Sequence, residues 1–285
     1  PKISNTGTLM TFSKGGQVWL ADLTNSNFES RKLFQLRGNQ SDIKWSPDDH
    51  QIAFRSSRGD HAFIGIYDFN TRQVKFLAPS VDLDFSPEWS PDGQSIAFIR
   101  KPNALEVPPF TPQKVGHPWS IIRYDLEIDQ AKTIWKADER MGSVFFGQFP
   151  SAALEWATPD ELIFPWEKEG WMHLYALQIS SGQTIELTEG AGIVEDYYLS
   201  RDKKTLLYTT NIGDLHRRHL GQIDLPSKKA TMLTSGTNSE FSPHFTAYGV
   251  VFLTTSAQHP SRPALLIKDK IQFIGNSSVV FENQN

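Results

Sequence analysis

The sequence contains no cysteine. This absence excludes disulfides, thiolate catalysis and zinc sites built on thiolates, and it leaves the redox compartment open. No apolar run approaches the roughly 20 residues that a membrane-spanning helix requires. The opening residues, PKISNTGTLM, contain neither the apolar core of a signal peptide nor an initiator methionine. We therefore expect a fragment of a longer chain, whose compartment, bacterial cytoplasm or periplasm, the sequence does not assign.

The sequence also lacks an excess of charge of one sign. It has 28 Lys and Arg against 32 Asp and Glu, a formal net charge of −4. No broad basic field exists to attract nucleic acid or anionic lipid, so we expect neither nucleic acid nor a membrane as a partner. The 285 residues include eight tryptophans and are 12% aromatic. This length suits one large all-β domain or two ordinary domains, and the aromatic content favours layered β packing.

The stretch from residue 85 to residue 100, FSPEWSPDGQSIAFIR, predicts a β-hairpin. Pro91 restricts φ in the turn, Asp92 can accept hydrogen bonds from the nearby backbone, and Gly93 adopts the positive φ that other residues resist. On each side of the turn, apolar and polar residues alternate with period two, which is typical of half-buried strands. The same unit returns along the whole sequence.

A serine or threonine at the turn of this unit recurs at a nearly constant spacing. The turn residues are Ser4, Ser46, Ser90, Thr158, Ser200 and Thr246. The gaps are 42, 44, 68, 42 and 46 residues, and four of the five lie close to the roughly 40–45 residues of a four-stranded propeller blade. No stretch has sustained 3.6-residue periodicity, so we expect very little helix. The sequence therefore predicts an all-β fold, a single β-propeller domain over residues 1–285 with six repeats visible.

The two ends and two insertions depart from the repeat. Only four residues precede the first turn, whereas SVVFEN, residues 278–283, forms an extra strand at the other end. This strand either completes the first blade and closes the ring, or begins a further blade. In the first repeat, KLFQL (32–36) is the predicted fourth strand. Residues 101–117, which contain four prolines, and residues 139–153 are predicted loops, and both a contact role and no role remain open for them.

The sequence lacks a G-x-S-x-G nucleophile elbow, an H-E-x-x-H motif and glycine-rich phosphate loops. The nearest match to the elbow, residues 93–97, lacks the final glycine and places Ser95 on a predicted strand. His216 and His219 fall on opposite faces of another predicted strand, which does not suit a zinc site. We predict no catalytic residue, no metal ligand and no cofactor in this chain. The carboxylates that recur at the turns are predicted to be structural: Asp48, Asp92, Asp160 and Asp202.

One acidic pair differs from these turn carboxylates. Glu167 and Glu169 leave the end of a predicted strand beside Trp166 and Trp171. Two carboxylates next to an aromatic face can hold a cationic group, so Glu167, Glu169 and Trp171 are the candidate substrate-binding residues. The alternative is a solvated hairpin tip with Trp171 packed on the next blade.

Two turns and two longer segments resemble a known family. The turns at residues 45–48 and 89–93, each followed by an Ile-Ala-Phe strand, resemble the repeats of TolB-like and prolyl-oligopeptidase-type propellers. The segments GHPWSIIRYDLE (116–127) and LIFPWEKEGWMHLYAL (162–177) are similar to the propeller of bacterial dipeptidyl-peptidase IV and acylaminoacyl-peptidase-like serine peptidases, the S9 family. The second segment matches the family pattern E-R-D-G-W-x-H-L-Y at Glu167, Gly170, Trp171, His173, Leu174 and Tyr175, with Lys168 and Glu169 in place of Arg and Asp.

The resemblance implies an N-terminal propeller that precedes an α/β-hydrolase domain in the same parent chain. The hydrolase domain would carry Ser, Asp and His, and the propeller would gate or position the peptide substrate without cleaving it. Dipeptidyl peptidases grip a free amino terminus with paired glutamates, but the run before Trp89 offers only Asp82 and Asp84. An acylaminoacyl- or oligopeptidase-like parent therefore stays open. The alternative is a free-standing TolB-like propeller that binds a protein, and a third reading is a propeller enzyme that acts on sugars.

Overall fold

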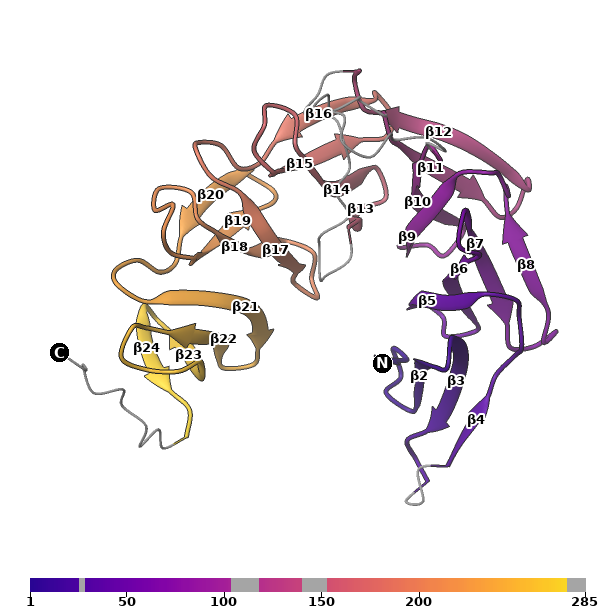
Figure 1. The fold of residues 1–285 in the computed structure, drawn as a ribbon, viewed down its shortest axis with the longest axis horizontal. Coiled ribbons are helices and arrows are strands. Elements are labelled where there is room, and N and C mark those ends of the chain that lie inside the picture. The colour runs from indigo at the N-terminus through magenta and orange to yellow at the C-terminus, as the bar shows by residue number, and fades with distance from the viewer. Residues whose placement is uncertain (26–28, 104–117, 140–152, 276–285) are drawn as a thin grey trace. The chain divides into compact units, whose positions relative to one another are not determined.

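The computed structural model describes residues 1–25, 29–103, 118–139 and 153–275 (Figure 1). Within these residues every regular element is a β-strand. The described residues contain no helix that is long and apolar enough to cross a membrane. The chain divides into two compact units, which we describe separately. The first comprises Pro1–Phe145 with the short pieces Thr158–Glu161 and Ile179–Gly182, and the second comprises the remainder.

The first unit contains a four-stranded sheet, which is blade one, and an eight-stranded sheet, which consists of blades two and three. Blade one consists of β1 (Lys2–Ile3), β2 (Leu9–Lys14), β3 (Gln17–Asp22) and β4 (Ser30–Lys32). Blade two consists of β5 (Asn39–Trp45), β6 (Gln51–Ser57), β7 (Ala62–Asp68) and β8 (Val74–Leu77). Blade three consists of β9 (Leu83–Trp89), β10 (Ser95–Lys101), β11 (Ser120–Asp125) and β12 (Gln130–Lys136). A single parallel pair, Ala62 with Leu83, joins blades two and three.

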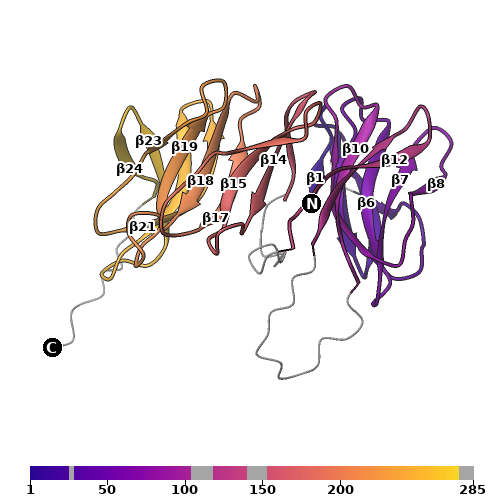
Figure 2. The same ribbon diagram turned by 90° about the horizontal axis from the view of Figure 1, so that it is seen from above.

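Blades four to six contain the remaining described strands. Two turns of blade four, at Thr158–Glu161 and Ile179–Gly182, belong to the first unit. Blade four consists of β13 (Glu155–Thr158), β14 (Glu161–Trp166), β15 (His173–Gln178) and β16 (Gln183–Glu186). Blade five consists of β17 (Val194–Leu199), β18 (Thr205–Thr210), β19 (His219–Asp224) and β20 (Lys229–Met232). Blade six consists of β21 (Ser239–Thr246), β22 (Gly249–Thr255), β23 (Arg262–Ile267) and β24 (Lys270–Phe273). Figure 2 shows blades five and six as separate sheets, and buried residues such as Leu220 and Phe252 pack between them.

The hairpin predicted around Gly93 is confirmed. Strands β9 and β10 flank the turn, and Gly93 has a φ of 71°. Ser90 Oγ donates to Asp92 Oδ1 at 2.5 Å and accepts the amide of Ser95 at 2.9 Å. The Asp92 carboxylate also accepts the amide of Gln94, and these bonds hold the pKa of Asp92 below its usual value. The turn is thus a closed local network, which explains why serine and aspartate recur in it.

The other turn carboxylates behave in two ways. Ser46 and Ser200 repeat the bond to the aspartate two residues later, at 2.6 Å in both turns. The structural role predicted for these carboxylates is therefore confirmed. Asp160 differs, because its carboxylate accepts the amide and the hydroxyl of Ser180 at 2.7 and 2.6 Å and ties two hairpin ends together. Ser95 lies on β10, as predicted, and the structure shows that it is fully buried.

The predicted fourth strand of blade one is wrong in its bounds. The structure has β4 at Ser30–Lys32, whereas the expected strand covered residues 32–36. The cause is the side chain of Gln17, which accepts the amide of Leu36 at 2.9 Å and donates to its carbonyl at 3.0 Å. A side chain thus takes the backbone groups that a strand partner would use.

The first blade does have a first strand. Strand β1 is only two residues long and pairs with β2. The indole N–H of Trp45 donates a hydrogen bond to the carbonyl of Lys2, at 3.1 Å. Residues 278–283 and most of the two predicted loops, 104–117 and 140–152, lie outside the described residues. The two explanations for the C-terminal strand therefore both stay predictions.

Candidate functional site

The three candidate residues lie on one hairpin tip, between β14 and β15. Glu167 is half-buried, Glu169 is exposed, and the Trp171 side chain is 40% exposed. Gly170 reverses the chain with a φ of 86°, and a Cβ added there would meet no atom within 4 Å. The glycine is therefore needed for its backbone conformation and not for space. Trp171 presents an indole to solvent instead of burying it.

The other tryptophan of this tip already has a cation beside it. Trp166 is 6% exposed, and its ring centroid lies 5.1 Å from that of Tyr175. Lys168 Nζ lies 5.3 Å from the centroid of Trp166. A cation from this chain thus lies over the ring of Trp166, which is one of the two tryptophans at this tip. Trp171 is the aromatic surface that remains accessible.

The electrostatics of the tip are acidic. Burial raises the pKa of the Tyr175 hydroxyl, and the charges of Glu186 and Glu169 raise it further. Two carboxylates close enough to oppose the ionisation of a phenol place negative charge beside this tip. The tip is therefore suited to a positively charged group, such as a peptide amino terminus or a basic side chain.

His173, which follows Trp171 in the matched pattern, is a structural residue. Its ring is 3% exposed, with Nδ1 3.2 Å from Thr188 Oγ1 and Nε2 3.1 Å from the carbonyl of Gly190. Thr188 Oγ1 already accepts the amide of Leu174 at 3.0 Å, so its proton is available to Nδ1, and Nε2–H donates to the carbonyl. Burial lowers the pKa of His173. We call this arrangement the His173 latch, because it holds the segment that leads from blade four into blade five.

A second buried histidine forms a related cluster that sequence reasoning missed. His219 Nδ1 lies 2.9 Å from Glu240 Oε2, and both side chains are nearly fully buried. Thr234 Oγ1 donates to the same carboxylate oxygen at 3.0 Å and accepts the amide of Leu220 at 2.8 Å. A nucleophilic hydroxyl would donate to the imidazole, whereas this one donates to the carboxylate. The cluster therefore fastens blades five and six and does not activate a nucleophile.

The strand predicted for His216 is wrong. Strand β19 begins at His219, and His216 lies in the preceding turn, where its amide donates to Asp214 Oδ1 at 3.1 Å. The signal that could have revealed the second cluster is the recurrence of His-Leu and Leu-Thr. These pairs occur at residues 173–174 and 187–188, and again 46 residues later.

The acidic run before Trp89 is committed to the fold. Asp84 is fully buried, and its two carboxylate oxygens accept from Arg100 Nε and Nη2 at 2.7 and 2.8 Å. Arg100 Nη2 also donates to the carbonyl of Ala78 at 2.6 Å. Burial raises the pKa of Asp84, although the pairing with Arg100 opposes this. Asp84 holds Arg100 within blade three while Arg100 reaches the Ala78 carbonyl in the segment that follows blade two, so this carboxylate is not available to a peptide amino terminus.

The first strands of four blades contain bulges that present side chains to one another. The register shifts in β5, β9, β17 and β21, and Asp42, Ser86 and Ser242 have φ values of 50–54° at these positions. Bulges of this kind re-aim the side chains that follow them. Two residues later along the chain, Lys44 of β5 forms an ion pair with Glu88 of β9 in the first unit. In the second unit the rings of Tyr198 and His244 lie 4.1 Å apart.

These four residues occupy one position of the repeat, two residues before the turn residue: Lys44, Glu88, Tyr198 and His244. Sequence reasoning did not single them out, since the bulge that aims them has no clear signature in residue type. Among the described residues, no group of three or more His, Asp or Glu side chains could hold a metal ion.

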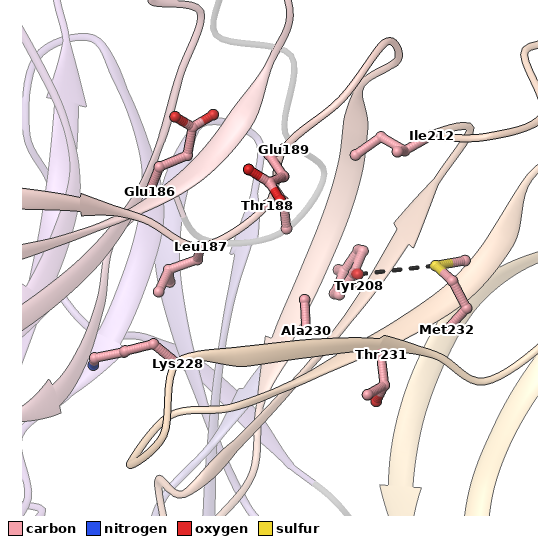
Figure 3. A pocket seen from close by; sticks show the side chains of 10 residues that line it. All are labelled: Glu186, Leu187, Thr188, Glu189, Tyr208, Ile212, Lys228, Ala230, Thr231 and Met232. Atoms are coloured by element: carbon pink, nitrogen blue, oxygen red, sulfur yellow. Dashed lines mark hydrogen bonds between the residues drawn. The ribbon is translucent and has the colours of Figure 1, made fainter.

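A groove of about 400 Å³ lies between blades four and five, inside the second unit (Figure 3). Its lining comes from β16 and the segment after it, from β18 and from β20: Glu186, Leu187, Thr188, Glu189, Tyr208, Ile212, Lys228, Ala230, Thr231 and Met232. Tyr208 is 4% exposed, and its hydroxyl lies 3.9 Å from Met232 Sδ, a weak acceptor. The groove shares no residue with the hairpin tip of blade four.

Comparison with known proteins shows one family and one fold. The family described as the dipeptidyl peptidase IV (DPP IV) N-terminal region matches residues 120–263, half of the chain, including the hairpin tip. No curated protein matches the sequence.

Solved structures give the fold. Puromycin hydrolase superposes with a TM-score of 0.70 at 14% identity, over 99% of this chain and 45% of that one. TolB from Acinetobacter baumannii superposes with a TM-score of 0.56 at 18% identity, over 95% of this chain and 64% of that one. The β-propeller domain of the Trilobed protease from Pyrococcus furiosus superposes with a TM-score of 0.63 at 14% identity, over 98% of this chain and 81% of that one. The chain thus has a β-propeller fold and spans only 45–64% of the first two proteins.

Proposed function

This chain belongs to the family of the dipeptidyl peptidase IV N-terminal region, and from this premise we propose that it is the non-catalytic propeller of an S9-type serine peptidase. Family and fold together make it a propeller domain of the S9-peptidase or TolB-like kind. In the proposed role the propeller gates or positions peptide substrates for an α/β-hydrolase domain of the same parent chain. The observation that carries the proposal is the family match over residues 120–263.

The hairpin tip of blade four supplies the proposed contact with the substrate. Glu167 and Glu169 provide carboxylates, and Trp171 provides an exposed indole, all within the residues that match the family. A cation held by a carboxylate over an aromatic face gains roughly 0.5–1 kcal/mol at an exposed site from the ring alone. The substrate class is therefore a peptide that presents an amino terminus or a basic side chain to the propeller.

The test uses the full-length parent protein. Glu169→Gln and Trp171→Ala should each lower kcat/KM for such a peptide by about three- to tenfold, chiefly through KM, because they remove binding and not chemistry. Glu127→Gln, which neutralises an exposed carboxylate of blade three, is the matched control. Unchanged kcat/KM in both tip variants would remove the tip from the proposed site. A parent gene without a G-x-S-x-G segment after this domain would overturn the peptidase itself.

The second candidate is a free-standing propeller that binds a protein. It is favoured by the likeness to TolB from Acinetobacter baumannii and by the Trp-Ser-Pro-Asp turns of blades two and three. A stop codon soon after residue 285 in the parent gene would select it. Roughly 250 further residues with the nucleophile elbow would select the peptidase, since that is the scale of one further large domain.

A further inference from the structure

The groove between blades four and five is a packing gap with a counterpart elsewhere in the chain. Its floor is Tyr208 of β18 (Figure 3). Tyr208 pairs with Gly221 of β19 across the sheet. A Cβ on Gly221 would lie 2.2 Å from the Tyr208 ring, so the glycine is what allows the ring to lie flat on the sheet. Blade two repeats this pair with Phe54 and Gly65, where an added Cβ would lie 2.6 Å from the ring.

In blade two an aromatic side chain from the neighbouring blade covers this pair. Phe34, from the segment that follows β4 of blade one, lies with its ring centroid 5.0 Å from that of Phe54 and 5.1 Å from that of Tyr67. Phe76 of β8 adds a third ring, 6.5 Å from Phe54. The junction of blades one and two is thus filled by three phenylalanines over a glycine.

The junction of blades two and three solves the same packing problem differently. Ala78 takes the place of Phe34, twelve residues before the turn serine in both cases. The third-strand residue opposite Phe98 is then Ile122 instead of glycine. A small residue at the position of Phe34 is thus balanced by a large residue at the third-strand position, as close packing requires.

The junction of blades four and five lacks this balance. The position of Phe34 is held by Thr188, and the third-strand position by Gly221, so both residues are small. Thr188 is retained there for another purpose, since it forms the His173 latch and accepts the amide of Leu174. Met232 replaces Phe76 opposite the glycine. The unfilled space is the groove of about 400 Å³, within the size of small-ligand sites.

The two sides of the groove differ in charge. Glu189 is exposed and lies on the wall formed by blade four, whereas Lys228 lines the groove beside β20 (Figure 3). Glu186 pairs with Tyr175 across β15 and β16, and Leu174 and Ala176 pack toward blade five. Glu186 also lines the groove, but the alternation of the strand points its side chain to the face of the sheet opposite to that of Leu174 and Ala176. Glu189 is the carboxylate that a bound segment meets.

We propose that this groove binds an aromatic side chain of a partner polypeptide, next to a basic residue that pairs with Glu189. The ring takes the place that Phe34 occupies between blades one and two. It packs on the face of Tyr208 and against the thioether of Met232, contacts that favour aromatic over aliphatic side chains. Buried aromatic anchors of this kind dominate protein–protein contacts. The site is separate from the hairpin tip, so its failure leaves the proposed function untouched.

The test follows the methyl signal of Met232 by NMR in the full-length protein with 13C-labelled methionine methyl groups, assigned by its loss in Met232→Leu. The probe is N-acetyl-phenylalanyl-arginine amide. It should shift this signal upfield in a saturable manner, because an aromatic ring stacks beside the methyl group. N-acetyl-leucyl-arginine amide should cause no upfield shift, and N-acetyl-phenylalanyl-glutamate amide should bind roughly threefold more weakly, in line with one exposed ion pair.

Two variants on the same strand make the test specific. Ala230→Phe fills the groove from β20 and should weaken probe binding at least tenfold. Lys229→Phe places the same ring on the preceding residue, which does not line the groove, and should leave binding unchanged. The Met172 signal, outside the groove, should stay unmoved in both and reports an intact fold. No shift of Met232, an equal shift with the leucyl probe, or full binding in Ala230→Phe would overturn the proposal.

Discussion

The two units fasten neighbouring blades with different side chains. In the first unit a tryptophan precedes the turn serines of blades two and three and reaches back across the junction: Trp45 Nε1 donates to the carbonyl of Lys2, and Trp89 Nε1 to that of Lys44, both at 3.1 Å. In the second unit the same positions are Ala157, Leu199 and Phe245, which have no side-chain donor. There the buried histidines perform the fastening, through the His173 latch and the His219–Glu240 pair.

The difference teaches that a junction demands satisfied backbone groups and not a particular residue. An amide or carbonyl buried between two sheets costs free energy unless it is bonded, whatever supplies the bond. Gln17 performs this task between blades one and two. Arg100, held by Asp84 within blade three, performs it by donating to the Ala78 carbonyl in the segment after blade two. The Trp-Ser-Pro-Asp pattern therefore fades along the chain although the blade persists.

The largest effect is expected from the charged junction of the first unit. Asp84→Ala should lower the free energy of unfolding by about 3–5 kcal/mol, because it leaves the guanidinium of Arg100 without its buried carboxylate. Thr188→Val removes a neutral hydroxyl from the second unit and should cost about 1–2 kcal/mol. Urea denaturation of the full-length protein measures both.

Asp82→Ala is the control for the charged junction. Asp82 is half-buried two residues away and accepts only longer bonds, at 3.3 and 3.4 Å. Its loss should cost less than about 1 kcal/mol. A loss for Asp84→Ala no larger than that for Thr188→Val would show that the two units do not differ in how strongly their junctions depend on charge.

The next effect concerns the indole bonds. Trp89→Phe keeps most of the buried ring but removes the donor to the Lys44 carbonyl, so we expect a loss of about 1–2 kcal/mol in the free energy of unfolding. The converse change, Phe245→Trp, supplies a donor where the second unit has none and should add up to about 1 kcal/mol. Thermal unfolding of both variants checks the pair. A neutral Trp89→Phe together with a destabilising Phe245→Trp would mean that the two positions are not equivalent.

Local chemistry made the blades predictable. The Ser90–Asp92–Gly93 turn closes on itself through bonds between residues at most five apart, so its residue types announce it in the sequence. The bounds of β4 were mispredicted because they depend on Gln17, nineteen residues from Leu36. A side chain that caps a distant backbone segment leaves no periodic trace.

The candidate site was predictable only as residue types on one tip. The order Glu-Lys-Glu-Gly-Trp places Glu167, Glu169 and Trp171 on a hairpin, but it does not reveal that Lys168 covers Trp166. The groove was not predictable at all. It arises because Thr188 and Gly221, which are 33 residues apart, are both small at one junction. Packing volume is a property of pairs that meet only after folding.

The smallest expected effect is a pH dependence of stability that comes from the His173 latch. Among the described residues, no junction of the first unit contains a buried histidine. Burial lowers the pKa of His173 below the usual value of 6.5, so the unfolded chain binds its proton more readily than the folded one. Stability attributable to this residue is therefore complete above about pH 6.5 and is lost as pH falls below it. His173→Gln should flatten the dependence of unfolding free energy on pH between about 7 and 5, with its difference from wild type at pH 8 as the baseline. An unchanged slope would mean that the latch stays closed around a protonated ring, and the contrast between the units would then be one of residue type alone.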